Sequence, residues 1–168
     1  MGEDAVAQGA QIILAGGCVA VPTETVYGLA ANALDGAAVA GIYTAKGRPS
    51  FNPLIVHITD VAMAETLASL NDIARALAAA CWPGPLTMVV PRLPDCPIAT
   101  IATAGLETIA LRCPAHPAMQ ALITASGVPL AAPSANASGG VSPTTAAHVA
   151  ASLAGRIPLI IDAGPCSA

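Results

Sequence analysis

The residues best suited to bind an anion lie in the segment 45–57, where the chain's one lysine, Lys46, stands two positions before Arg48. In an extended segment this spacing would point both side chains to the same side. Two cations held together repel each other unless an anion lies between them, so the pair indicates a phosphate or carboxylate ligand. Pro49 and Pro53 favour a stiff, extended loop over a helix interior. For these residues alone, a solvated surface loop is the alternative.

A second group of polar side chains, in residues 22–29, follows directly on a short apolar stretch that predicts a buried strand. Its sequence, PTETVYGL, places two threonine hydroxyls, a carboxylate and a phenol within a few positions. Polar side chains at the end of a strand commonly line a binding site. A threonine-rich turn that caps itself by side-chain hydrogen bonds is an equally good interpretation of this stretch.

A third group, residues 132–142, is a run of small residues with the sequence APSANASGGVS. Backbone N–H groups and hydroxyls could approach an anion closely there and hold a phosphate. The run lacks the Gly-x-x-x-x-Gly-Lys-Ser/Thr pattern of a Walker P-loop. For this group alone, a flexible loop is therefore the simpler interpretation.

Two further polar residues lie at the ends of predicted strands in apolar surroundings. Arg112 ends the strand 108–112, and an arginine in such a setting usually has a carboxylate partner, either within the protein or on a ligand. His57 lies near the end of the strand 54–58, where an isolated histidine is more often a structural residue than a ligand. Each is a candidate site residue with a structural role as the alternative.

The strands and helices that must position these residues are predicted by the apolar patterns. Strands are expected at residues 18–21, 54–58, 86–90, 108–112, 129–132 and 158–162. Helices are expected at residues 4–15, 35–45, 60–70, 117–125 and 142–153, another begins near residue 73, and residues 91–104 form a loop. Asp35, Asp60 and Ser142 are predicted N-caps, whereas either Asn71 or Asp72 could cap the helix near residue 73. Alternating strands and helices predict an α/β or α+β domain layered around one sheet.

Length and composition limit the class of protein. With 168 residues the chain is expected to form one domain, and no apolar run approaches the roughly 20 residues that span a bilayer. Five cysteines without a Cys-x-x-Cys pair predict reduced thiols and no zinc site. A net charge of −4 and few aromatic residues argue against a base-stacking RNA platform. The N-terminus lacks the basic start of a secretory signal, so a cytoplasmic location is expected.

Five motifs, taken together and in order, resemble the YrdC-like domain of the threonylcarbamoyl-AMP synthases: PTETVYGL, AKGRPSFNPLIVH, WPGPLT, ETIALRCPAHP, and APSANASG followed by VSPT. The resemblance implies a twisted mixed sheet with flanking helices around a positively charged cavity, in one domain over residues 1–168. It implies an enzyme that forms threonylcarbamoyl-AMP and pyrophosphate from L-threonine, bicarbonate and ATP. The product would serve threonylcarbamoyladenosine modification of tRNA through a downstream transferase.

The resemblance also implies roles for individual residues. Lys46 and Arg48 would be catalytic, because they can offset the repulsion between a threonine carbamate and the α-phosphate that it attacks. The residues matched to ATP contacts are Arg48, Asn52, Thr108, Ser134, Asn136 and Ser142. The residues matched to L-threonine contacts are Thr25, His57, Arg112 and the backbone of Ala132. Magnesium is expected to enter with ATP, held by phosphate oxygens and water, so that no dedicated metal ligands are expected.

Two other functions stay open at this level: a carbamoyl-AMP-dependent carbamoyltransferase-type domain, and an inactive nucleotide- or RNA-binding module. The family pattern normally continues past the region of residues 161–168 into a further segment and a later arginine. We therefore expect a chain that lacks the family's C-terminal segment, a cavity open on one side, and weakened or absent activity. Tight binding of both ATP and L-threonine in isothermal titration would contradict that expectation.

Overall fold

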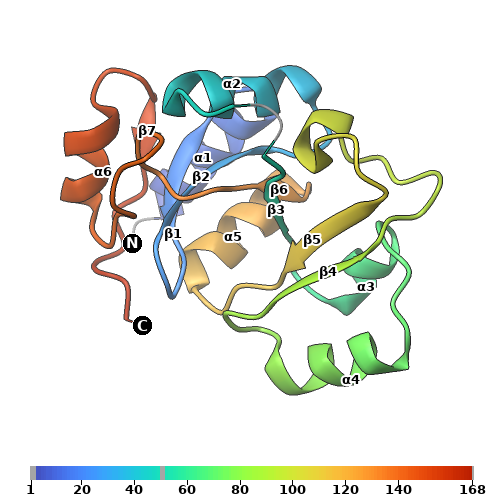
Figure 1. Ribbon diagram of the computed structural model, residues 1–168. Coiled ribbons are helices and arrows are strands. Elements are labelled where there is room, and N and C mark those ends of the chain that lie inside the picture. The colour runs from blue at the N-terminus through green and yellow to red at the C-terminus, as the bar shows by residue number, and fades with distance from the viewer. Residues whose placement is uncertain (1–2, 50–51, 168) are drawn as a thin grey trace.

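A seven-stranded mixed sheet forms the centre of the computed structural model, which describes residues 3–49 and 52–167 (Figure 1). Its strand order is β4-β5-β3-β6-β2-β1-β7. The strands are β1 (Val19–Pro22), β2 (Tyr27–Asn32), β3 (Ile55–His57), β4 (Thr87–Pro91), β5 (Thr108–Arg112), β6 (Leu130–Ala131) and β7 (Leu159–Ile160). The pairs β1–β7 and β3–β5 are parallel, and the other neighbours are antiparallel. The predicted α/β layering around one sheet is confirmed.

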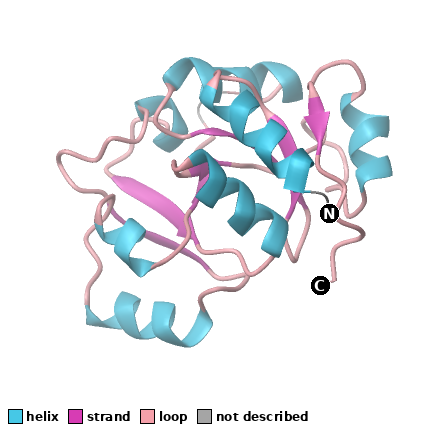
Figure 2. Ribbon diagram, turned by 180° about the vertical axis from the view of Figure 1, so that it is seen from behind, coloured by secondary structure: helices cyan, strands magenta, loops and turns pink. Residues whose placement is uncertain are grey.

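Helices cover both faces of this sheet. They are α1 (Glu3–Leu14), α2 (Gly36–Lys46), α3 (Val61–Glu65), α4 (Asp72–Cys81), α5 (Pro117–Ser126) and α6 (Ala146–Leu153), with a 3₁₀ turn η1 (Thr100–Thr103). Helices α1 and α5 pack together across β1, β2 and β6, as Figure 2 shows from behind. Helices α2, α3, α4 and α6 contribute to the core on the opposite face. In the described part of the chain, no helix is both long and apolar enough to cross a bilayer.

The two halves of the sheet differ in how they are covered. All four residues of β1 are buried, because helices lie over both of its faces. On β5, Ile109 and Leu111 enter the core, whereas Thr108 is exposed and Ala110 half-buried. Val89 on β4, which pairs with Ala110, is 68% exposed. Since alternate residues of a strand face opposite ways, β4 and β5 present an accessible face that ends at the buried Arg112.

Helix ends follow the capping rules, with one correction. The Asp35 side chain accepts hydrogen bonds from two N–H groups in the first turn of α2, and Asp60 caps α3, both as predicted. Asn71 caps α4, which settles the choice that the sequence left open. The cap of α6 is Thr145, so the predicted start at Ser142 is wrong. The reason is that the carbonyl of Pro143 accepts the N–H of Tyr27 at 2.8 Å, which ties this stretch to β2 and not to a helical turn.

Three other local expectations were incomplete. Strand β2 was not predicted, because its sequence YGLAAN has few of the β-branched residues that mark strands. The 3₁₀ turn η1 lies inside the region expected to be a loop. Helix α3 ends at Glu65, short of the expected residue 70. The six strands predicted from apolar runs are all present: β5 has the expected bounds, β1 and β4 are shifted by one residue, and β3, β6 and β7 are two or three residues shorter than expected.

Candidate active site

The turn between β1 and β2 is held by its own threonine. The N–H groups of Thr25 and Val26 donate to the hydroxyl oxygen of Thr23, each at 3.2 Å, and the N–H of Thr23 donates to the carbonyl of Val26 at 2.9 Å. This is the self-capped turn that was one interpretation of the stretch. It also presents Glu24 and Thr25 to Arg112, and whether these residues line a binding site stays a prediction.

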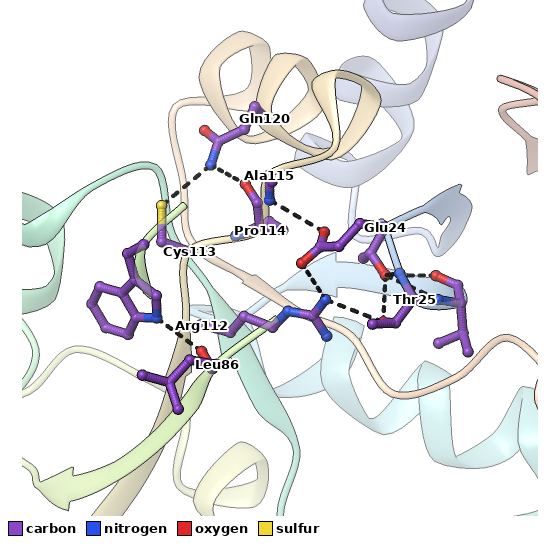
Figure 3. A network of polar contacts seen from close by, with 11 residues as sticks. Glu24, Thr25, Leu86, Arg112, Cys113, Pro114, Ala115 and Gln120 are labelled. Carbon is purple, nitrogen blue, oxygen red and sulfur yellow. Dashed lines mark hydrogen bonds and ion pairs between the residues drawn. The ribbon is translucent and has the colours of Figure 1, made fainter. Parts of the chain in front are cut away.

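Arg112, the last residue of β5, is the centre of a polar network shown in Figure 3. Its Nη2 donates to Glu24 Oε1 at 2.6 Å and to the Thr25 hydroxyl at 3.1 Å. Arg112 is 7% exposed, and its Nε is buried without a hydrogen-bond partner among the described residues. Burial raises the pKa of Glu24, but the hydrogen bond and charge of Arg112 outweigh burial and leave that pKa below its usual value. The predicted carboxylate partner is therefore confirmed.

His57 lies beside Arg112, because the parallel pairing of β3 and β5 sets these two residues in register. The imidazole is 2% exposed, and its Nδ1 lies 3.2 Å from the carbonyl oxygen of Ile55. Burial and the neighbouring charge of Arg112 lower the pKa of His57 to about 4. A neutral imidazole next to a guanidinium adds hydrogen-bonding capacity without a second positive charge.

Lys46 is the last residue of α2 and is 3% exposed. Its Nζ donates to the carbonyl oxygen of Ser134 at 2.5 Å and to that of Asn136, while its own carbonyl accepts the N–H of Ser138 at 2.8 Å. Burial, and then the charge of Arg48, lower the pKa of Lys46 to about 8. Lys46 thus fastens the small-residue loop 132–142 to the end of α2.

The expectation that Lys46 and Arg48 share an extended segment is wrong. Helix α2 runs through Lys46 and ends on Gly47, whose φ of 62° is left-handed, because a glycine there can close the helix without strain. The two cations are nevertheless close enough for Arg48 to lower the pKa of Lys46. Among the described residues, Arg48 reaches only the carbonyl of Pro53, at 3.5 Å, and its Nε is buried without a partner. Residues 50 and 51 of the predicted loop lie outside the described residues.

Asn52 and Asn136, two further expected site residues, are held by different contacts. The carbonyl of Asn52 accepts a hydrogen bond from the Tyr43 hydroxyl at 2.8 Å. Asn136 is 4% exposed, and its Nδ2 donates to the carbonyls of Ala137, at 3.0 Å, and Gly140, at 2.8 Å. Its Oδ1 is buried without a partner in the described part of the chain. Buried polar atoms that lack a partner are rare, and they mark positions where a ligand can supply one.

The residues form two groups: the Arg112 cluster, made of Arg112, Glu24, Thr25 and His57, and the Lys46 cluster, made of Lys46, Arg48, Asn136 and the loop 132–142. They are joined through the sheet. The Ala132 N–H, at the end of β6, donates to the carbonyl of Ile55 at 3.0 Å, next to His57 on β3. Ser134 forms an isolated bridge with Gly28 on β2, three residues after Thr25. The sheet therefore links the two clusters: β3 sets His57 beside Arg112 on β5, and the segment after β6 leads into the loop that Lys46 contacts.

Two of the expected site residues, Thr108 and Ser142, are exposed. Thr108 is exposed at the other end of β5, so its Cα lies roughly 13 Å along the strand from that of Arg112. Ser142 is exposed in the stretch that leads to α6. Whether these two residues contact ATP stays a prediction.

Glu24 is the site residue that sequence reasoning missed. The stretch PTETVYGL was recognised as polar, but only Thr25 was taken from it. The available signal was a carboxylate directly after a buried strand in a chain with 10% charged residues. Its partner Arg112 lies 88 positions away, so the pair itself was not visible in the local sequence.

The chemistry of the two clusters is that of anion binding. No group of three or more histidine, cysteine, aspartate or glutamate side chains that could hold a metal ion occurs within residues 3–49 and 52–167. Guanidinium, ammonium, amide and backbone N–H groups are the partners that carboxylates and phosphates prefer. Fold and candidate site together therefore define an α/β protein with a seven-stranded mixed sheet and two clusters of side chains of the types that bind anions.

Comparison with known proteins places the chain more narrowly. Residues 11–168 match the Sua5/YciO/YrdC family model, which carries the description telomere recombination, and the chain belongs to this family. The resemblance seen in the five motifs is confirmed.

The chain is similar to threonylcarbamoyl-AMP synthases along most of its length. It is 53% identical over 161 residues to that of Bacillus subtilis (strain 168) and 52% identical over 156 residues to that of Pyrococcus abyssi. These matches cover 95% and 92% of this chain but 46% and 45% of the relatives. A structure of P. abyssi Sua5 complexed with L-threonine superposes with a TM-score of 0.92 at 50% identity, over 95% of this chain and 47% of the other. The chain thus spans about half the length of these relatives.

Proposed function

We propose that this chain carries out the synthase reaction, forming threonylcarbamoyl-AMP and pyrophosphate from L-threonine, bicarbonate and ATP. The observation that carries the proposal is the buried Arg112, bound to Thr25 and lying in register with the neutral His57. Synthases about half identical to this chain, and a relative's complex with L-threonine, support it. The domain over residues 1–168 would be the catalytic YrdC-like unit.

The Arg112 cluster is the proposed threonine site. A carboxylate can accept a hydrogen bond from the Nε of Arg112, which is buried and has no acceptor among the described residues. Thr25, His57 and the backbone of Ala132 are polar groups around it that could bind the rest of the amino acid. The neutral imidazole of His57 can donate or accept a hydrogen bond without repelling an ammonium group.

The Lys46 cluster is the proposed nucleotide site. Within the described part of the chain the Nε of Arg48 and the Oδ1 of Asn136 have no hydrogen-bond partner, so they offer a donor and an acceptor. Lys46 donates hydrogen bonds to two carbonyls of the loop 132–142. In this proposal it therefore acts on the ligand through its positive charge and by holding that loop in place. Asn52, Thr108, Ser134 and Ser142 complete the proposed set.

In the proposed reaction, a carbamate oxygen of N-carboxylated threonine attacks the α-phosphorus of ATP. The bond from that phosphorus to the bridging oxygen breaks, and pyrophosphate leaves with the bonding electrons. Charge accumulates on the α-phosphoryl oxygens, where the cations of Lys46 and Arg48 would stabilise it. A magnesium ion fits this cluster only through phosphate oxygens and water, because the cluster is made of cations, hydroxyls and amides. Use of the product for tRNA, through a downstream transferase in the cytoplasm, is part of the same proposal.

The test is pyrophosphate release together with mass spectrometry of the reaction mixture for threonylcarbamoyl-AMP. Release is expected to require both L-threonine and bicarbonate, and to fall about 100- to 1,000-fold in Arg48→Ala and in Lys46→Ala. Arg48 is only half-buried, so its variant separates lost chemistry from lost folding. Arg75→Ala on α4, which removes an exposed partner of Glu65, is the matched control and keeps full activity. Pyrophosphate release that does not depend on L-threonine contradicts the proposal. Pyrophosphate release that requires carbamoyl phosphate instead favours a carbamoyltransferase.

A further inference from the structure

Glu24 joins three separate parts of the chain through its carboxylate. One oxygen accepts from Arg112 Nη2 at the end of β5, and the other accepts from the N–H of Ala115 at 3.2 Å, just before α5. The segment between them is fixed in turn, because Gln120 on α5 donates to the carbonyl of Pro114 at 2.8 Å (Figure 3). The glutamate itself extends from the self-capped turn after Thr23. Each end of the Glu24–Arg112 pair is therefore anchored to rigid backbone.

The pair also fixes which atoms of Arg112 remain available. Nη2 is used by both Glu24 and Thr25, whereas Nε is buried with no acceptor among the described residues. The Arg112 and Glu24 side chains are 9% and 14% exposed, so water gives little compensation if either loses the other. A guanidinium recognises a carboxylate by its fixed planar fork, and this recognition depends on its orientation.

We infer that Glu24 is a positioning residue, which sets the orientation of Arg112 and thereby the preference of the site for a carboxylate. This inference rests on the proposed function, in which Arg112 receives the carboxylate of L-threonine. Glu24 stays bound to Nη2 when the ligand enters and acts on the ligand only through Arg112. Its removal leaves the arginine in place but held at Nη2 by Thr25 alone, so that it rotates more freely and the gain from a ligand carboxylate falls.

The first experiment needs no ligand. Nitrogen-15 relaxation of the Arg112 Nε–H group is measured in the wild-type chain, in Glu24→Ala and Glu24→Gln, and in the exposed-site control Glu107→Gln. A rigid Nε–H in wild type and control, with a lower order parameter in both Glu24 variants, is expected. An unchanged order parameter in the Glu24 variants overturns the inference. Glu24→Gln retains one acceptor for Arg112, so it provides a folded variant if Glu24→Ala does not fold.

The second experiment compares calorimetric binding of L-threonine and L-threonine amide, which lacks the carboxylate. Wild type and Glu107→Gln are expected to prefer L-threonine, and Glu24→Ala is expected to lose about tenfold of this preference while its affinity for the amide changes less than threefold. Equal losses for both ligands would mean a merely structural role, and tighter binding of L-threonine would mean that Glu24 competes with the ligand; either overturns the inference. If wild type binds neither compound, the proposed threonine site fails, and the relaxation data decide the role of Glu24 separately.

Discussion

His57 and Arg112 are neighbours on adjacent strands, and their proximity affects the stability of the fold at low pH. The folded pKa of His57 is about 4, lowered by burial and by the arginine charge, whereas an ordinary histidine has a pKa near 6.5. Between these two values the unfolded chain binds a proton that the folded chain does not. Folding stability therefore declines as the pH falls from 6.5 towards 4.

Replacing His57 by glutamine should remove most of this decline. The shift corresponds to at most about 3 kcal/mol of unfolding free energy over that range. Denaturant unfolding of wild type and His57→Gln at pH 6.5 and at pH 4.5 measures it. The pKa of His116 is also lowered by burial, so His116→Gln is the control, and the smaller burial predicts a smaller effect. Parallel pH dependence in wild type and His57→Gln would show that His57 does not titrate as described.

For individual residues, the sequence indicated the candidate side chains but not the groups with which they form hydrogen bonds. Lys46, Arg48 and Asn136 were recognised through the motifs, but the contacts of Lys46 were not, because they depend on α2 continuing through that residue. The need of Arg112 for a carboxylate could be predicted from its apolar setting. The identity of that carboxylate could not, because the β1–β2 turn reaches it only through the sheet order.

Secondary structure elements show how one side chain can define a helix end. Asn71 and Asp72 are adjacent and both are good N-cap types, but the Asn71 side chain accepts the N–H of Ala74 at 2.9 Å. Asp72 is then the first helical residue, where its charge interacts with the helix dipole. A capping hydrogen bond and a charge–dipole interaction differ in their response to salt.

Asn71→Ala is therefore expected to cost about 1 kcal/mol of unfolding free energy, at low salt and in 1 M NaCl alike. Asp72→Ala should cost about 0.3–1 kcal/mol at low salt and close to nothing in 1 M NaCl, because the dipole interaction is screened. Denaturant unfolding of both variants at the two salt concentrations measures this. A salt-independent loss in Asp72→Ala, with no loss in Asn71→Ala, would assign the cap to Asp72.

Elements with a clear apolar pattern or a polar cap were predictable, and elements fixed by distant contacts were not. The stretch 108–112 alternates buried and accessible residues and was predicted with its exact bounds. Strand β2 has a weak local signal and exists because β1 and β6 pair on either side of it. The start of α6 was misplaced because Pro143 is held by Tyr27 of β2.

The five cysteines are spread over the whole molecule and differ in how deeply they are buried. All are free thiols: Cys18, Cys96 and Cys113 are buried, Cys166 is half-buried and Cys81 is exposed on α4. Burial raises the pKa of Cys18 to about 11 and also raises the pKa of Cys113 and Cys166. The thiolate is the reactive form, so raised pKa and burial both protect these residues.

Iodoacetamide should therefore label Cys81 first in the folded protein, Cys166 more slowly, and the three buried cysteines only after denaturation. Mass spectrometry of peptides taken over a time course at pH 7.5 measures the order, with guanidinium-denatured protein as the reference for complete labelling. Early labelling of Cys18 in the absence of denaturant would contradict its burial beside α2, where its thiol lies 3.9 Å from the carbonyl oxygen of Ala38.

The parallel pairing of β1 with β7 also matters during synthesis. Strand β1 lies at residues 19–22 and its neighbour β7 at residues 159–160. At 5–20 residues per second, the ribosome needs roughly 7–28 s to travel from one strand to the other. The β2 edge of the β1–β2 hairpin stays unpaired until β6 has been made, and the β1 edge stays unpaired throughout the interval, so that other chains can pair with it. This edge is the place where we expect chaperones to act on the nascent chain, and where slow translation would favour aggregation.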